Sequence, residues 1–308
     1  MKGKRKLLIL GCGYVGGAVA ESRLAAGWEV WGVSRNPEVL GRLGARAGFH
    51  PVVAEVDGSG WHEAVPGDAD AVLNCVSAAG GGVDGYRKSY LGGNRSLVEW
   101  ARRAQPERIL YTSSTTVYPF TDGREVFEED AGGDLSETGR VILESERILL
   151  DDPAAGPRTT VLRLAGIYGP GRHHLLDSLR NGVETLPGRG DFFLNLIHLD
   201  DIVSAFERVI DCPAAAGRVY NVSDGHPPTK QELVAWLARR LGRPVPEFDP
   251  EAAGRRLRVN AAGDPPNRRI RIDRIHAETG WVPACANFES GYERILDGGW
   301  PNFFRSAS

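Results

Sequence analysis

Three glycines near the start of the chain have the spacing of a phosphate-binding loop. Gly11, Gly13 and Gly16 follow a short apolar run and lead into a stretch of helical character that Tyr14 and Val15 open. The first glycine permits a tight turn, the second lets the backbone approach a pyrophosphate, and the third allows close packing of helix on strand. The N-terminus of that helix offers free N–H groups and a positive dipole end to phosphates. The pattern therefore predicts a dinucleotide site.

The residues after the second expected strand select between the two nicotinamide dinucleotides. An NAD site usually has Asp or Glu there, which bonds the ribose 2′-hydroxyl. This chain has Ser34 and Arg35 instead. A guanidinium pairs with a 2′-phosphate, the serine adds a hydroxyl donor, and no carboxylate repels the phosphate. We predict NADP as the cofactor, with NAD as the alternative if Arg35 is only a solvated loop residue.

Small and polar residues near the ends of later strands are candidates for the remaining cofactor contacts. Asp57 can bond the adenine amino group, or it serves only as a turn residue. Ser77, Ala78 and Ala79 begin a run of small residues, which lets a cofactor lie close to the backbone; a flexible connection is the plain alternative. Ser113 completes the predicted cofactor set.

Strands and helices must alternate along the first half of the chain to position these residues. Apolar runs and periodicity predict strands at 7–10, 28–33, 52–56, 71–76, 108–113 and 160–164, and helices at 15–26, 91–104 and 135–150. This alternation implies a parallel sheet covered on both faces. The predicted fold class is α/β, a Rossmann doubly wound parallel sheet with a smaller C-terminal substrate lobe.

The second half of the chain has a different character. Residues 166–195 carry many Gly, Pro and polar positions around one short helix expected at 175–181. Further helices are expected at 202–210 and from Thr229 to Leu241, where Thr229 and Glu232 have the spacing of a capping box. A strand is expected at 219–222, and the tail to residue 308 is expected to be irregular.

This order suggests two domains, one of them discontinuous. Residues 1–165 and 190–222 are assigned to the dinucleotide-binding Rossmann domain, and residues 166–189 and 223–308 to the substrate-binding lobe. The substrate is expected where the two meet, beside the carboxyl ends of the strands.

Composition and charge argue against several classes of protein. The 308 residues carry a formal net charge of −3 with scattered Lys and Arg, which does not indicate a nucleic-acid face. The four cysteines lack the pairing of a zinc site or a disulfide framework, so no metal is predicted. No stretch approaches the roughly 20 apolar residues of a membrane span. We expect a cytoplasmic protein that acts on a small molecule.

Several stretches, in order, resemble the extended short-chain dehydrogenase/reductase superfamily, also called the NAD-dependent epimerase/dehydratase family. They are residues 11–17, 111–118, 162–172, 195–202 and 220–223. A narrower resemblance, to the atypical YeeZ-like branch, is carried by residues 139–144, 163–172 and 267–269. Members of that branch generally lack an assigned substrate. The resemblance implies the Rossmann fold and its cofactor, and a homodimer formed through the helices after the fourth and fifth strands.

The resemblance also exposes a missing pair of catalytic residues. Family enzymes that move hydride use a Ser or Thr, a Tyr, and a Lys four residues after the Tyr. Ser114 occupies the Ser/Thr position. Aligned on Gly139 and Glu146, Thr138 falls where the Tyr belongs and Ile142 where the Lys belongs. A threonine hydroxyl is far less acidic than a phenol, and isoleucine has no charge, so the usual proton relay is absent.

Three hypotheses about function follow from this absence. The first is an NADP-dependent oxidoreductase that reduces a small carbonyl, imine or alkene without the Tyr/Lys pair. The second is non-redox epimerase or isomerase chemistry in the same cleft, and the third is a catalytically inactive NADP(H)-binding sensor or partner protein. His173 and His174, which follow a Gly-rich loop, are candidate proton donors, or they are exposed polar residues. The candidate catalytic set is therefore Ser114, Thr138, His173 and His174.

Overall fold

A parallel sheet of seven strands forms the centre of the computed structural model, which describes residues 3–78, 80–252 and 265–298. In spatial order its strands are β11 (Arg218–Val222), β7 (Thr159–Leu164), β5 (Arg108–Ser114), β4 (Ala71–Asn74), β1 (Lys6–Leu10), β2 (Glu29–Ser34) and β3 (Phe49–Val53). The order reverses between β1 and β4, which are neighbours with Leu7 opposite Ala71. This topological switch point confirms the predicted Rossmann fold and marks where a ligand binds in such sheets.

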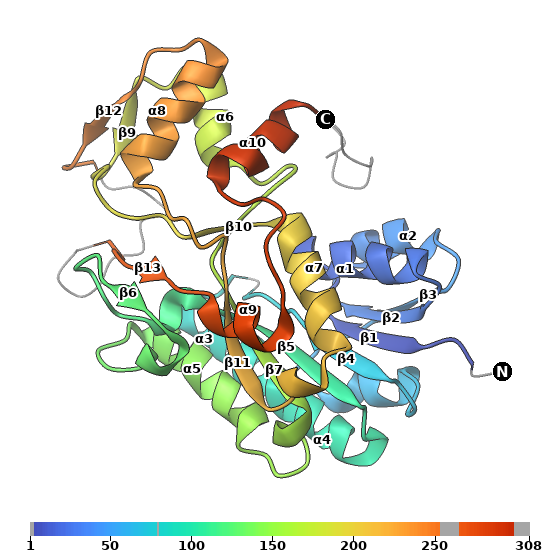
Figure 1. Cartoon of the computed structure of the whole chain (residues 1–308). Coiled ribbons are helices and arrows are strands. Elements are labelled where there is room, and N and C mark those ends of the chain that lie inside the picture. Colours follow the sequence, from blue (N-terminus) through green and yellow to red (C-terminus); the bar gives the residue numbers. More distant parts are fainter. Residues whose placement is uncertain (1–2, 79, 253–264, 299–308) are drawn as a thin grey trace.

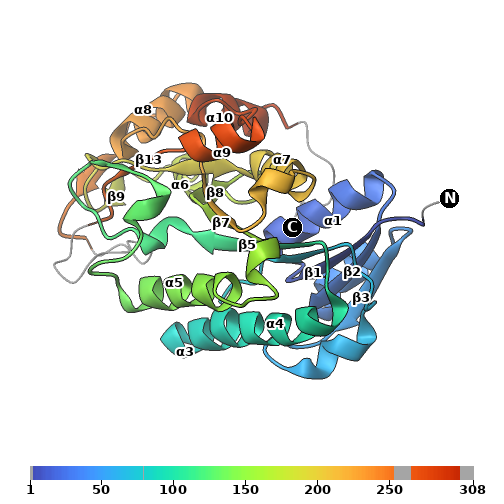
Figure 2. The same cartoon turned by 60° about the horizontal axis from the view of Figure 1, so that its bottom comes forward.

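Different helices cover the two faces of the sheet. Alternate residues of β1 point to opposite sides and pack against the helices on each face. Leu7 and Ile9 belong to one buried apolar cluster, and Leu8 and Leu10 to another. The helices are α1 (Tyr14–Ala25) and α7 (Leu199–Ile210) on the first face, and α4 (Gly93–Ala104) and α5 (Glu137–Leu150) on the second (Figure 2). The core of the domain is thus one layer of apolar side chains on each face of the sheet.

The connection from β4 to α4 becomes helical at Gly82 and contains a π-helical turn. α3 (Gly82–Tyr86) runs into the π turn η2 (Arg87–Gly92), which runs directly into α4. π-helical turns are rare and are found frequently at functional sites. The sequence predicted the helix only from residue 91, so this turn was missed.

A smaller lobe lies above one edge of the sheet, at the top of Figure 1. It consists of α6 (His174–Arg180), α8 (Lys230–Leu241), α10 (Phe288–Leu296) and the paired strands β9 (Thr185–Pro187) and β12 (Glu247–Asp249). Leu176, Leu237 and Tyr292 belong to its own buried apolar cluster. The strands β8 (Gly166–Tyr168) and β10 (Leu196–His198) pair with each other and connect the lobe to the sheet.

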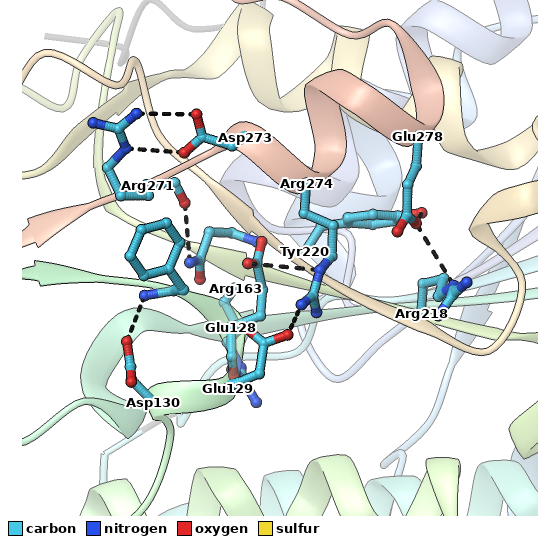
Figure 3. Close-up of polar contacts among 12 residues, drawn as sticks. Glu128, Glu129, Asp130, Arg163, Arg218, Tyr220, Arg271, Asp273, Arg274 and Glu278 are labelled. Atoms are coloured by element: carbon cyan, nitrogen blue, oxygen red, sulfur yellow. Dashed lines mark hydrogen bonds and ion pairs between the residues drawn. The ribbon is translucent and has the colours of Figure 1, made fainter.

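The segment near the C-terminus returns to the sheet. β13 (Arg269–Ile270) pairs with β6 (Glu125–Val126), and α9 (Asp273–Thr279) packs near β11. Figure 3 shows the polar contacts that join these parts, including Arg274 with Glu129 and Arg218 with Glu278. Ile275 is fully buried in the main core, so apolar packing rather than these exposed ion pairs holds the segment.

The sequence placed most elements correctly, and two expectations were wrong. The third strand ends at Val53 and includes Pro51, which is tolerated because β3 is an edge strand. Asp57 therefore lies beyond the strand rather than at its end. The tail was expected to be irregular, yet it contains β13, α9 and α10. The capping box at Thr229 and Glu232 is confirmed.

Within the described ranges, none of the helices is both long enough and apolar enough to cross a membrane.

Candidate functional site

A cleft of about 1170 Å³ opens at the carboxyl ends of the strands, between the sheet and the smaller lobe. Its walls on the sheet side come from the loops after β1, β2, β4 and β5, and from η2. The lobe contributes the start of α6, residues 186–187 and 192–196, and Lys230 and Leu233 of α8. The predicted location of the site, where the two parts meet, coincides with this cleft.

Each of the three glycines of the first loop suits its position for a different structural reason. A Cβ on Gly16 would lie 2.0 Å from the carbonyl oxygen of Gly11, so the helix could not approach the loop. Gly11 has φ +94°, and a Cβ there would lie 2.9 Å from the backbone of Val76. A Cβ on Gly13 would meet no described atom within 4 Å, and Gly13 lines the cleft. The space above Gly13 is therefore where a pyrophosphate fits.

The start of α1 is arranged to receive an anion. Its N-cap is Gly13, which provides no capping side chain, and its first turn contains no acidic residue. The N-terminus of such a helix offers N–H groups to a ligand, and the dipole favours a negative charge there. Tyr14 and Val15 line the cleft beside them. The thiol of Cys75 donates to the carbonyl oxygen of Gly11 at 2.9 Å and holds the loop in place.

The corner after β2 contains the residues predicted to select the cofactor. Ser34 and Arg35 both line the cleft, and Arg35 is exposed to solvent. The neighbouring wall has Lys88 of η2, whose ammonium lies 2.5 Å from Glu55 and 3.9 Å from Asp57. The hydrogen bond from Lys88 lowers the pKa of the Glu55 carboxyl. Two cationic side chains, Arg35 and Lys88, thus lie at this corner of the cleft.

Four of the five other predicted cofactor residues lie in the wall of the cleft. Asp57, Ser77, Ala78 and Ser113 line the cleft, whereas Ala79 lies outside the described residues. The hydroxyl of Ser113 donates to Glu146 beneath the cleft floor, so its side chain is already engaged. Taken with the open space at Gly13, these walls fit a dinucleotide laid across the carboxyl ends of β1 and β4.

The predicted catalytic residues do not all line the cleft. Ser114 lines the cleft, and its Oγ accepts a hydrogen bond from the backbone N–H of Thr116 at 3.2 Å. Thr138 is half-buried on α5, outside the wall of the cleft, with its Oγ1 3.2 Å from Ser136 Oγ. Ile142 is 1% exposed and packs in an apolar cluster with Val117. The structure therefore does not bring Thr138 and Ser114 to one wall.

Two tyrosines that the sequence analysis missed lie on this side of the cleft. Tyr86 and Tyr90 line the cleft and pack against the apolar cluster that contains Ile142. Their ring centroids are 5.3 Å apart. The spacing of four residues places both on one face of a helix. That spacing was the one available signal, and it is too common to identify a site.

A buried ion pair supports the floor of the cleft. Arg163 and Glu146 are 5% and 1% exposed, with 2.7 Å between Nη2 and Oε2. Arg163 also donates to the Tyr118 hydroxyl at 2.9 Å and to the carbonyl oxygen of Glu128 at 2.7 Å. Figure 3 shows Arg163 beside Glu128. This network joins α5 to β7, so Arg163 has a structural role.

The two candidate histidines line the cleft from the lobe. His173 is half-buried, and its Nδ1 lies 2.9 Å from Oδ1 of Asp177, one helical turn later. His174 is exposed and is the first residue of α6. The Tyr14 hydroxyl donates to the carbonyl oxygen of Pro170 at 3.0 Å, which ties the loop before these histidines to the glycine loop.

The lobe wall also contains two charged residues that the sequence analysis did not predict as site residues. Lys230 and Arg268 are 8% and 6% exposed, yet both line the cleft. Arg268 donates to the carbonyl oxygen of Thr115 at 2.7 Å, beside Ser114. Burial lowers the pKa of the Lys230 ammonium. In the sequence, Lys230 stands next to a capping box, which gives no hint of burial.

A second group of titratable residues lies at the junction of the lobe, outside the cleft wall. Side-chain ligand atoms of His198, Asp201 and Cys285 lie within 4.8 Å of one another, and all three residues are buried. Asp201 accepts hydrogen bonds from the backbone N–H groups of Ala284 and Cys285. Burial lowers the pKa of His198 to about 4, so the imidazole is neutral at physiological pH. These contacts hold the chain after α9 against α7.

Comparison with known proteins gives a consistent result. A model of the NAD-dependent epimerase/dehydratase family matches residues 7–223. The chain is 30% identical over 258 residues to Protein YeeZ of Escherichia coli (strain K12), a match that covers 79% of this chain and 86% of YeeZ.

Solved structures agree with this match. A conserved protein of unknown function from Silicibacter pomeroyi DSS is 27% identical, with a TM-score of 0.76 and coverage of 96% of this chain and 99% of that one. dTDP-glucose 4,6-dehydratase from Bacillus anthracis, solved with NAD, has a TM-score of 0.80 over 95% of this chain and 96% of its own. At 17% identity the second likeness concerns the fold alone. The chain belongs to the NAD-dependent epimerase/dehydratase family, with an NAD(P)-binding Rossmann fold and a YeeZ-like sequence.

Proposed function

We propose that the chain is an NADP(H)-dependent oxidoreductase that reduces a small carbonyl, imine or activated alkene without a Tyr/Lys pair. The observation that carries this proposal is one continuous cleft, lined by the glycine loop, by Ser34 and Arg35, and by Ser114 and His173. A cofactor cradle and polar side chains suited to a reacting group thus share one space.

Each part of the cleft has a proposed task. Gly13 and the start of α1 hold the pyrophosphate, and Arg35 pairs with the 2′-phosphate. When bound, the nicotinamide ring supplies the hydride. Ser114 donates a hydrogen bond that orients the substrate. His173 supplies the proton, because the Asp177 carboxylate engages one ring nitrogen and leaves the other for the substrate. An imine or activated alkene makes a smaller demand on an acid than a ketone does.

The cofactor preference is tested by titrating the protein with NADPH and with NADH while nicotinamide fluorescence is recorded. Arg35→Ala should weaken NADPH binding about tenfold, roughly the 1.4 kcal/mol expected for one charge-assisted contact, and leave NADH nearly unchanged. Arg42→Ala is the matched control, since Arg42 is an exposed arginine on the next helix away from the cleft wall.

Equal losses for both nucleotides in Arg35→Ala would defeat the NADP assignment. If the wild-type protein bound neither nucleotide, the proposed function would fail entirely.

The chemical step is tested by following NADPH absorbance against a panel of carbonyls, imines and activated alkenes. Turnover of one class identifies the reaction. His173→Asn should then lower kcat strongly and change KM little. NADPH binding without turnover of any class would favour a binding-only sensor, and NADP(H)-independent isomerisation would favour non-redox chemistry.

We also propose the division of the chain at residues 165, 190 and 222, with β13 and α9 packed back against the Rossmann domain, and a homodimer that pairs through α4 and α5. The resemblance to extended short-chain dehydrogenases supports the dimer. Sedimentation velocity measures the mass, and a monomer at micromolar concentration would rule the dimer out.

A further inference from the structure

Lys230 carries a charge in a place where a charge is costly. The residue is 8% exposed, and its ammonium donates to the carbonyl oxygen of Pro187 at 2.7 Å. The ring centroids of Phe248 and Phe192 lie 4.9 and 5.9 Å from Nζ. Aromatic faces attract a cation, but they do not neutralise it.

No described carboxylate pairs with this ammonium. The lowered pKa of Lys230 has burial as its cause, without an acidic neighbour to offset it. Lysine is almost never buried in proteins unless it is paired. Lys230 is also the first residue of α8, where the helix dipole disfavours a cation. Packing and local structure therefore leave the charge of Lys230 uncompensated.

The cleft around Lys230 also lacks acidic residues. Among the residues described along its walls, Asp57 is the one carboxylate, and it lies near Lys88 at the end assigned to the cofactor. Arg172 and Arg268 line the lobe side together with Lys230. This half of the cleft is thus positively charged, and a low-dielectric wall strengthens its attraction for an anion.

We propose that Lys230 binds an oxyanion group of the substrate, a carboxylate or a phosphate, between Phe192 and the carbonyl oxygen of Pro187. The ligand supplies the negative charge that no described side chain provides. The ammonium donates to the ligand the hydrogen bonds that it does not make to Pro187. The proposal rests on the proposed function for the remainder of the substrate, but the oxyanion site itself is independent of hydride transfer.

The test uses simple oxyanions as probes, because the substrate is unidentified. Malonate and inorganic phosphate are titrated calorimetrically into the full chain saturated with NADP⁺, which fills the phosphate cradle at Gly13. Lys230→Met should weaken oxyanion binding at least tenfold, and Lys230→Arg should retain most of it. A higher affinity for malonate then indicates a carboxylate substrate, and a higher affinity for phosphate indicates a phosphate substrate.

Two further measurements separate this site from a structural role and from the cofactor site. Lys230→Met should leave NADPH affinity unchanged and should not lower the melting temperature, because it removes an uncompensated buried charge. If the wild-type protein does not bind NADP⁺, the proposed function fails; the titrations are then run without it, and the oxyanion binding lost in Lys230→Met still supports the site.

Equal oxyanion binding by the wild type and Lys230→Met would overturn the proposal. So would the absence of any oxyanion binding to the wild type at tens of millimolar, or a large fall in melting temperature for Lys230→Met with oxyanion affinity unchanged.

Discussion

The two walls of the cleft differ in how much of a family enzyme they keep. At the cofactor wall, Gly11, Gly13 and Gly16 retain a geometry that any side chain would disturb or fill. The reaction wall is the side of the cleft where the Tyr and Lys of a family enzyme would stand. Here Thr138 lies outside the cleft and Ile142 is packed into an apolar cluster. The first wall is made of backbone and the second of side chains.

That difference teaches why one wall can change while the other does not. A backbone cradle depends on close approach of a loop, a strand and a helix, so it is coupled to the fold itself. A catalytic side chain can be replaced by a residue that packs well, because the fold gains burial where it loses a charge. The absence of the Tyr/Lys pair is therefore compatible with an intact cofactor site.

The largest expected effect comes from restoring the missing lysine. Ile142→Lys should destabilise the protein by about 3–5 kcal/mol, because it places an unpaired charge in an apolar cluster. Urea unfolding measures the loss. Ile142→Val is the matched control and should cost about 0.5–1.5 kcal/mol. A stable Ile142→Lys protein would show instead that this position opens to the cleft.

The same contrast explains what the sequence could and could not predict. The glycine loop, the parallel sheet and the corner at Arg35 were predictable, because strand and helix periods and loop spacing are local signals. The missing Tyr and Lys were visible from alignment of α5 on Gly139 and Glu146. Their physical replacement was not, since the packing of Ile142 depends on side chains brought from other elements.

Long-range placement hid the remaining site residues. Tyr86 and Tyr90 line the cleft from α3 and from the π turn that joins α3 to α4, and no sequence signal marked that turn. Lys230 reads as an ordinary helix start, and its burial results from packing near Phe192 and Phe248. The tail was read as irregular because α9 and α10 are short and lack a long period.

An intermediate effect separates fold from binding within the cofactor wall. Gly16→Ala should cost about 1–3 kcal/mol, because its Cβ would lie 2.0 Å from the Gly11 carbonyl oxygen and the helix must move. Gly13→Ala should leave stability within about 0.5 kcal/mol yet weaken NADPH binding, because its Cβ enters space reserved for the ligand. Thermal unfolding and NADPH titration of both variants check this pair. Equal NADPH affinity in Gly13→Ala and the wild type would place the pyrophosphate elsewhere.

The smallest expected effect is at Thr138, and it tests the reaction wall directly. Thr138→Val removes a hydroxyl whose recorded hydrogen bond is to Ser136, so stability and NADPH affinity should change by less than about 0.5 kcal/mol. Ser114→Ala is the comparison, because Ser114 lines the cleft and its loss should lower turnover. A large fall in turnover for Thr138→Val would mean that α5 reaches the substrate after the cleft closes. An unchanged rate would leave Ser114 and the lobe residues, His173 among them, as the groups that act on the substrate.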